Sequence, residues 1–326
     1  MKPIIGTLRK LLGLALAGTM SLAIAQQPAG SYPSKPIRII VPFAAGISPD
    51  VVARILADKL GQSLGQPVVV DNRPGASGII GAEMAAKSPP DGYTLLMSVT
   101  AIMSMNPHLY SRLSYDPIKD FKPVSHILNV PFVLIAAPQK LFSTMGELVQ
   151  ASKKAPDTIE FATLGAGSHS HVAMAWLMNQ TGAKLTHVPY KGTPATDLMS
   201  GLVSVYFDPI VTAIPLITTN KVKALGISTL KRSPALPQVP AISETVPGFD
   251  TYAYQGIFAP AGTPDAIVEK LNAELVRIVH MPDVQKKLSD FGYVTVGSSI
   301  ADFRRLVKDD FQAYGEVIKR NGIRLD

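Results

Sequence analysis

The segment Pro42 to Asp50, PFAAGISPD, has the residue types that could hold a small anion. It follows a short apolar run, Ile37 to Val41, and leads into residues with helical spacing. Ser48 suits the N-cap and Pro49 the first helical position, where its missing N–H costs nothing. An anion at this turn would meet unpaired backbone amides and the positive end of a helix dipole. We therefore expect an anion-binding turn, although most such turns in α/β proteins bind nothing.

Three histidines, His169, His171 and His187, could bind a metal ion, because imidazole is a common metal ligand. The chain has no cysteine, however, and no compact His/carboxylate spacing such as HExxH. We therefore expect no metal site. His171 can instead be a helix residue whose ring holds the preceding loop in shape. His169 could face a ligand or the solvent.

Two serines stand where a nucleophile could be sought. The GxSxG pattern around Ser63 needs a strand before the serine and a helix after it, and here the order is reversed. An exported α/β hydrolase that uses Ser63 or Ser168 is an alternative function, but no base and orienting acid can be assigned. Residues 165–167 lack the third glycine of a dinucleotide fingerprint, because Ser170 takes its place. We expect no cofactor.

Lys191 is the cation that could pair directly with a carboxylate, or it could be a solvated loop lysine. A hydrogen bond to a charged group contributes about 1.5–3 kcal/mol. Several loop amides would therefore suffice for micromolar binding, which corresponds to about −8 kcal/mol. No buried arginine is required.

Composition and the first residues indicate an exported protein. The chain has 326 residues, 47% of them hydrophobic, which is enough for two domains. Lys2, Arg9 and Lys10 precede an apolar run that ends in Ala-Ile-Ala at position 25, the pattern of a secretory signal. No later stretch approaches the roughly twenty apolar residues of a membrane span. Without cysteine, no lipid anchor or disulfide is expected. The net charge of +7 includes the three signal cations, and no dense basic run suggests nucleic-acid binding.

Short apolar runs alternate with helical patterns along the chain, which indicates an α/β fold with mostly parallel sheets flanked by helices. The first helix is expected to stop at Gly61, and Thr144 with Glu147 to form a capping box. We expect a lobe formed by residues 128–248, inserted into a lobe formed by residues 33–127 and 249–326, after a signal peptide at residues 1–25. Strands are expected at residues 37–41, 68–70, 93–99, 130–137, 159–162, 185–189, 203–207, 222–227 and 252–259.

Nine motifs occur in a fixed order: YPSKPIRIIVPFAAG, VVVDNRPGASG, DGYTLL, NPHLY, FATLGAGSHSH, VPYKGTPATDL, FDPI, KVKALGIST and GIFAPAGTP. From about Tyr32 to Asp326 the chain closely resembles the solute-binding receptors of the tripartite tricarboxylate transporter family, the Bug-type periplasmic proteins. The resemblance implies a monomeric, two-lobed periplasmic-binding protein of Venus-flytrap architecture with two interlobe crossings, soluble in the periplasm. Such receptors hold a small carboxylate on backbone amides of strand-to-helix loops and deliver it to membrane permease subunits. They are not enzymes.

The ligand identity stays open among di- or tricarboxylates, amino acids and aromatic acids. A ligand-loaded sensor that docks on a signalling receptor is a further alternative. The chain departs from the family at Ile47, where a second glycine is usual, at Ala166, where asparagine is common, and in a shorter segment at residues 193–197. A valine at Gly46 is expected to block the amides while leaving the fold little changed. The expected ligand-binding residues are Phe43, Ala44, Ala45, Gly46, Ile47, Ser48, Asp50, Ser98, Thr100, Ala101, Thr163, Gly165, Ala166, Gly167, Ser168, His169, His171, Tyr190, Lys191, Gly192, Thr193 and Asp208.

Overall fold

The computed structural model describes residues 32–326, of which Pro33–Asp326 form one compact unit. The signal-peptide prediction, residues 1–25, lies outside the described residues. Within them, no helix combines the length and the apolar character that crossing a membrane requires.

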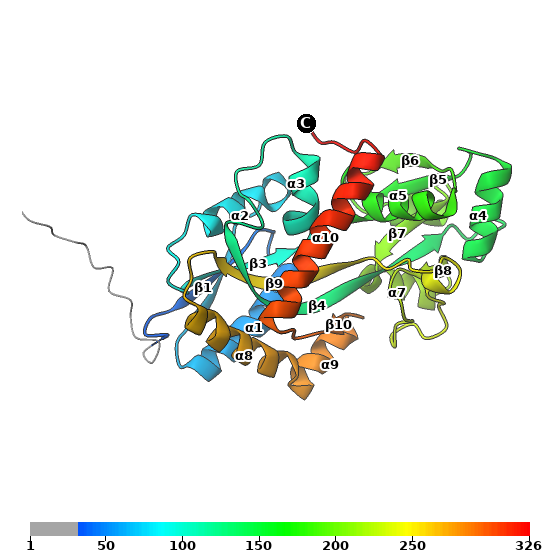
Figure 1. Ribbon diagram of the computed structural model, residues 1–326. Coiled ribbons are helices and arrows are strands. Elements are labelled where there is room, and N and C mark those ends of the chain that lie inside the picture. The colour runs from blue at the N-terminus through cyan, green and yellow to red at the C-terminus, as the bar shows by residue number, and fades with distance from the viewer. Residues whose placement is uncertain (1–31) are drawn as a thin grey trace, which may run out of the picture. The chain divides into compact units, whose positions relative to one another are not determined.

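A ten-stranded sheet runs through this unit in the order β2-β1-β3-β9-β4-β7-β5-β6, and β8 and β10 also pair with β4 (Figure 1). Strands β1 to β3 lie at one end of the sheet and β5 to β7 at the other, and each end carries its own helices. These are the two lobes. The strands are β1 Ile37–Val41, β2 Val68–Asn72, β3 Thr94–Val99, β4 Phe121–Ala136, β5 Glu160–Thr163, β6 Thr186–Pro189, β7 Val205–Pro209, β8 Lys223–Ile227, β9 Tyr252–Pro260 and β10 Val294–Thr295.

The sheet is parallel within each lobe and antiparallel where the lobes join. Strand β1 pairs in parallel with β2 and β3, and β5 pairs in parallel with β6 and β7. Strand β4 pairs antiparallel with β7, β8, β9 and β10. The expectation of parallel sheets therefore holds for the outer strands. The joining strands must differ, because the chain enters the second lobe along β4 and returns along β9 in the opposite direction.

Strand β4 is longer than the sequence pattern predicts, because polar residues interrupt its first half. Ser125 and His126 are buried, yet both are paired: the Ser125 hydroxyl donates to the Ser298 carbonyl, and His126 Nε2 lies 2.6 Å from Asn129 Oδ1. These hydrogen bonds offset the cost of burial. Strand β4 can therefore run through both lobes as residues 121–136, whereas the apolar pattern predicts a strand only at residues 130–137.

Ten α-helices flank the sheet in the described part of the chain. Helix α1 continues past Gly61 to Leu64 and ends at Gly65, which has a φ of 68°. The predicted stop at Gly61 was wrong, because a glycine can lie inside a helix, whereas the left-handed end residue favours one. The Thr144–Glu147 capping box is confirmed. The helices are α1 Ser48–Leu64, α2 Ile79–Ala86, α3 Asn106–Leu109, α4 Met145–Lys154, α5 His169–Thr181, α6 Ala195–Ser200, α7 Ile210–Thr218, α8 Asp265–Val279, α9 Pro282–Asp290 and α10 Ile300–Arg320.

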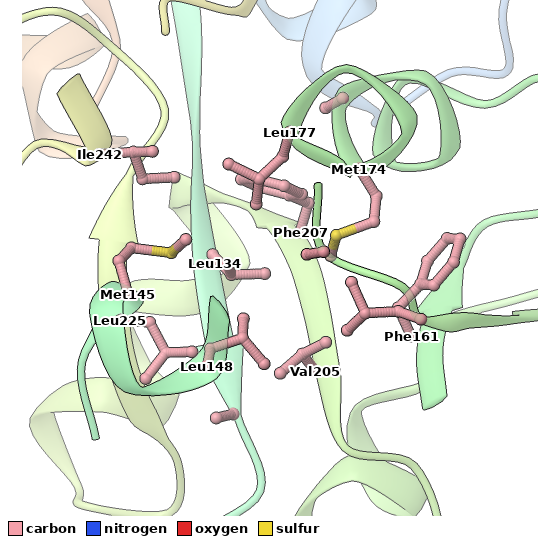
Figure 2. Close-up of a cluster of buried hydrophobic side chains, with 14 of the residues drawn as sticks. Leu134, Met145, Leu148, Phe161, Met174, Leu177, Val205, Phe207, Leu225 and Ile242 are labelled. Carbon is pink, nitrogen blue, oxygen red and sulfur yellow. The ribbon is translucent and has the colours of Figure 1, made fainter. Parts of the chain in front are cut away.

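Each lobe has its own apolar core. In the first, Ile40, Leu96 and Phe258 of the sheet pack with Phe303 of α10. Figure 2 shows the second, in which side chains from β4, β5, β7, β8 and helices α4 and α5 pack together. A third cluster joins α3, α5 and α10, and α10 lies across the middle of the sheet (Figure 1). Helix α10 therefore packs both against α3 of the first lobe and against α5 of the second.

Candidate ligand-binding site

The first candidate loop, residues 42–47, joins β1 to α1 and is held from within by Asp50. Residues 44–47 are exposed, and Gly46 has a φ of 87°. The buried Asp50 accepts hydrogen bonds from the Gly46 amide at 2.8 Å, from Arg54 Nε at 3.0 Å and from Asn72 Nδ2 at 2.8 Å. Burial raises the pKa of Asp50, but these hydrogen bonds outweigh it and hold the pKa below its ordinary value. Both carboxylate oxygens of Asp50 thus accept hydrogen bonds from within the protein, and these bonds hold the loop in place.

The remaining amides of this loop are available. Within residues 32–326, the amides of Ala44, Ala45 and Ile47 donate no hydrogen bond. The prediction that Ser48 caps α1 was wrong: Ile47 occupies the N-cap, and no side chain caps the helix. The Ser48 hydroxyl instead accepts a hydrogen bond of 2.7 Å from Gln255 Nε2 of β9. The helix start is therefore left open to an external acceptor.

The second candidate loop, residues 164–168, joins β5 to α5 and repeats this construction. The Gly167 amide donates to Nδ1 of His171 at 3.1 Å, so a glycine amide is again tied to a side chain four residues later. The Gly165 amide donates to Thr163 Oγ1. In the described part of the chain, the amides of Ala166 and His169 have no acceptor. Gly46 and Gly167, expected as ligand donors, are thus engaged internally, and their neighbours are free.

His171 and His187 form a stacked pair behind the second loop. Their ring centroids are 3.9 Å apart with planes 14° apart, and His187 Nε2 lies 2.7 Å from Thr163 Oγ1. Burial, with a contribution from His187, lowers the pKa of His171 to about 4, and burial also lowers the pKa of His187. Stacked rings present faces to each other and do not converge on one metal ion. Among the described residues, no group of three or more potential ligands that could hold a metal is found.

We predict that His171 makes the protein sensitive to acid. Histidine in the unfolded chain has a pKa of about 6.5, and His171 in the folded protein has a pKa of about 4. Between these values the unfolded chain binds the proton more readily, so the stabilisation is complete above pH 6.5 and is lost as pH falls toward 4. Protonated Nδ1 could no longer accept from the Gly167 amide. In urea titrations, His171→Gln should lose less free energy of unfolding over this range than wild type. Equal losses would contradict the prediction.

The sequence left a ligand or the solvent as surroundings for His169, and in the structure its side chain packs on β4 and on the residue before β9. Its ring stacks on Phe132 of β4, with centroids 4.3 Å apart, and its Nε2 lies 3.1 Å from Thr251 Oγ1. Only its amide is available to a ligand at the second loop.

The strand ends beside the first loop place their side chains inside the protein. Ser98 and Thr100 are buried, and the Thr100 hydroxyl accepts from the Tyr254 amide at 2.8 Å. The Thr100 hydroxyl, which was expected to contact the ligand, therefore bonds to the backbone of β9. The Ser98 hydroxyl is buried without a partner in the described residues. Ala101 is half-buried and begins a short π-helical turn, Ala101–Met105.

The remaining predicted residues lie at the ends of β6 and β7. The Tyr190 hydroxyl donates to Asp197 at 2.7 Å, and burial together with Asp197 raises the Tyr190 pKa to about 12. Lys191, Gly192 and Thr193 are exposed. Asp208 is buried and accepts from the Thr212 hydroxyl at 2.6 Å, and its burial raises its pKa to about 6. The exposed residues are free to reach a ligand, whereas Asp208 is held in the second lobe.

In the described part of the chain, neither serine hydroxyl considered as a nucleophile forms a hydrogen bond with a histidine. The Ser63 hydroxyl donates to Glu274 at 2.5 Å and accepts from Arg277 at 2.8 Å, on the surface between α1 and α8. The Ser168 hydroxyl donates to the Gly165 carbonyl at 2.7 Å. A serine nucleophile needs a base within hydrogen-bond reach, so this arrangement does not favour a hydrolase.

Strand β9 and Thr251, the residue before it, contact the two helix starts. Gln255 bonds to Ser48 at the start of α1, and Thr251 bonds to His169 at the start of α5. Thr251 and Gln255 are four positions apart along extended chain, which places their Cα atoms about 14 Å apart. Sequence reasoning missed both residues. The signal for Gln255 was available, since it is the one long polar side chain in the apolar run of residues 252–260.

Four surface cavities of 690, 500, 380 and 220 Å³ lie along α10 and residues 107–123. Their linings include no residue of the two loops. The candidate site is therefore defined by its backbone donors and not by one of these cavities.

Comparison with known proteins gives a consistent result. Residues 52–323 match the model of the tripartite tricarboxylate transporter family receptor. The chain is 35% identical to Protein BugT of Bordetella pertussis (strain Tohama I) over 301 residues, 91% of this chain and 92% of the relative. It is similar to Rpa4515 of R. palustris, solved with adipate (32% identity, TM-score 0.78, covering 90% of this chain and 100% of that one). It is also similar to MatC of Rhodopseudomonas palustris, solved with bound malate (33% identity, TM-score 0.74, covering 88% and 100%).

The matched residues span most of the chain and include the second loop, α5 and α1 from Val52 onward, whereas the first loop, residues 42–47, precedes the match. The fold agrees with that of solved periplasmic binding proteins, including BugD. This protein therefore belongs to the tripartite tricarboxylate transporter receptor family and is a solute-binding receptor of the Bug type.

Proposed function

We propose that this receptor is exported to the periplasm, captures a small carboxylate between its lobes and delivers it unchanged to a permease of the tripartite tricarboxylate type. The observation that carries the proposal is the shared construction of the two loops. Each leaves unpaired amides at a helix start and fixes a glycine amide with a side chain four residues later. The carboxylate groups of the ligand would accept hydrogen bonds from Ala44, Ala45 and Ile47 of the first loop at one end and from Ala166 and His169 of the second at the other.

Main-chain donors alone can supply the affinity. Each charge-assisted hydrogen bond contributes about 1.5–3 kcal/mol, and micromolar binding requires about −8 kcal/mol. Four such bonds would meet that requirement after part of their energy offsets the ordering of the ligand. The exposed Lys191 would add attraction for an anion without being required.

Two exposed apolar side chains suggest what lies between the ligand's polar ends. Ile47 is 46% exposed beside the amides of the first loop, and Leu164 is 45% exposed at the start of the second. A ligand with an apolar body would cover them, whereas a hydroxyl placed against them would lose hydrogen bonds to water. In calorimetric titrations we expect adipate to bind with a stoichiometry of one, and about tenfold or more tighter than malate. Tighter binding of malate would contradict this preference.

The receptor function itself is tested by recovery of the ligand. Purified mature protein should release the bound acid chemically unchanged, as monitored by proton NMR over hours. Turnover of the acid by the protein alone would reject the proposal and favour an enzyme. A thermal-shift panel of carboxylates would extend the test beyond adipate and malate, because binding raises the melting temperature by mass action.

The single tryptophan should report ligand binding. Trp176 lies in α5, partly buried, and its ring packs edge-on against Tyr314 of α10 at 5.6 Å. Ordering of the second loop fixes the start of α5 and should change this contact. We expect Trp176 emission to shift with the same dissociation constant as calorimetry gives. A flat fluorescence titration beside a clear heat signal would remove this prediction only.

A further inference from the structure

His169 is the residue at which the second loop meets both strands that pass between the lobes. It is the first residue of α5. Its ring stacks on Phe132 of β4, with planes 15° apart. Its Nε2 lies 3.1 Å from the hydroxyl of Thr251, the residue before β9. One imidazole thus contacts both crossings.

The contacts of His169 continue into α10. The Thr251 hydroxyl also lies 3.0 Å from the Tyr314 hydroxyl, and both residues are buried. The Tyr314 ring packs against Trp176, about two turns further along α5 than His169. A continuous set of contacts therefore joins the second loop, the start of β9 and α10.

One nitrogen of His169 is unpaired. Its Nδ1 is buried and has no partner in the described residues, and burial lowers the pKa of His169 to about 3, so the ring is neutral. A phenylalanine would stack on Phe132 equally well and would leave no polar atom unpaired, which is a cost that proteins usually avoid. Packing therefore does not explain a histidine here, whereas the bond to Thr251 does.

We propose that His169 is a positioning residue that couples the second ligand loop to the interlobe crossing. The inference rests on the proposed function, because the His169 amide is one of the donors assigned to the ligand. A ligand that binds this amide fixes the position of the first residue of α5. Through its hydrogen bond the imidazole then also fixes the position of Thr251, and with it the start of β9. Closure of the lobes around the ligand then depends on the bond between His169 and Thr251.

The test removes this bond from either side. His169→Phe keeps the stacked ring, and Thr251→Val keeps the shape of the side chain. Each is expected to weaken adipate binding about three- to tenfold and to reduce the adipate-induced decrease in radius of gyration measured by small-angle X-ray scattering. The double variant should bind adipate no more weakly than the weaker single variant, because both changes remove the same bond.

Two controls separate coupling from a merely structural role. Tyr314→Phe removes the other bond to Thr251 and keeps the packing on Trp176, so it should lower the melting temperature while leaving adipate affinity unchanged. His169→Gln can still bond to Thr251 and should restore adipate affinity to within about threefold of wild type. If His169→Phe does not fold, the comparison of Thr251→Val with Tyr314→Phe carries the test.

The outcomes distinguish this inference from the function on which it rests. Wild-type affinity in both single variants, or additive losses in the double variant, would overturn the coupling and leave the receptor function intact. A wild-type protein that binds neither adipate nor any other acid of the panel would instead reject the proposed function.

Discussion

Replacement of Asp50 by alanine is expected to weaken adipate binding about ten- to a hundredfold and to lower the free energy of unfolding by about 2 kcal/mol. The carboxylate is 1% exposed and accepts hydrogen bonds from the Gly46 amide and Asn72 Nδ2. Without it, these donors lose their acceptor and the loop can adopt other conformations. The Arg54 side chain is 54% exposed, so the loss of that ion pair contributes little.

The sign of this effect decides between two roles for Asp50. If the carboxylate acted on the ligand only through its charge, its removal from the edge of an anion site would tighten binding. If it holds the loop, its removal weakens binding. Calorimetry of Asp50→Ala therefore gives opposite results for the two roles, and tighter binding would refute the one proposed here. Asp50→Asn, which keeps the shape and one acceptor oxygen, should lie between wild type and alanine.

Glu147 provides a matched control in the second lobe. It is also a carboxylate near a helix start, and it accepts from the Ser143 amide at 2.6 Å and the Thr144 amide at 3.2 Å. It lies in α4, away from both candidate loops (Figure 1). Glu147→Ala should lower the melting temperature and leave adipate affinity unchanged. A loss of affinity there would show that instability alone accounts for the Asp50 result.

The sequence predicts where the loops lie because their position follows from local pattern. Alternating apolar runs and helical spacing place a loop after β1 and another after β5, and the structure has both. It could not predict which amides are free. That depends on the direction of the Asp50 and His171 side chains, each of which accepts a hydrogen bond from a glycine amide of the loop before its helix. For His171 the sequence left two roles open, a ligand contact or a ring that holds the preceding loop in shape, and the structure has the second. Asp50 was expected as a ligand contact, because residue type does not reveal side-chain direction.

Long-range pairing explains the other differences. His169 could not be assigned from sequence, because its partner Thr251 is 82 residues away. The length of β4 was missed because its buried polar residues are satisfied by segments distant in the chain, such as Ser298. The lobe boundaries predicted at residues 128 and 248 stay a prediction. The local sequence pattern therefore predicts the helices and strands, whereas contacts between distant segments determine the hydrogen-bond partners of the buried polar residues.

Substitution of Gly46 by valine is expected to reduce adipate affinity at least about tenfold and, unlike the expectation from sequence, to lower stability by about 1–2 kcal/mol. A Cβ at this position would meet no atom within 4 Å, so steric block is not the cause. The cause is the φ of 87°, which a β-branched residue rarely adopts. The loop must shift to relieve this strain, and the amides of Ala45 and Ile47 shift with it.

Gly65, at the other end of α1, makes this prediction specific. It has a φ of 68°, and a Cβ there would also meet no atom within 4 Å. Gly65→Val therefore introduces the same kind of strain in the same helix, but 17 residues of helix separate it from the ligand loop. Both variants should lower the melting temperature by similar amounts, and only Gly46→Val should weaken adipate binding. Equal affinities for the two variants would mean that the first loop does not bind the ligand, because a receptor that uses these amides cannot tolerate their displacement.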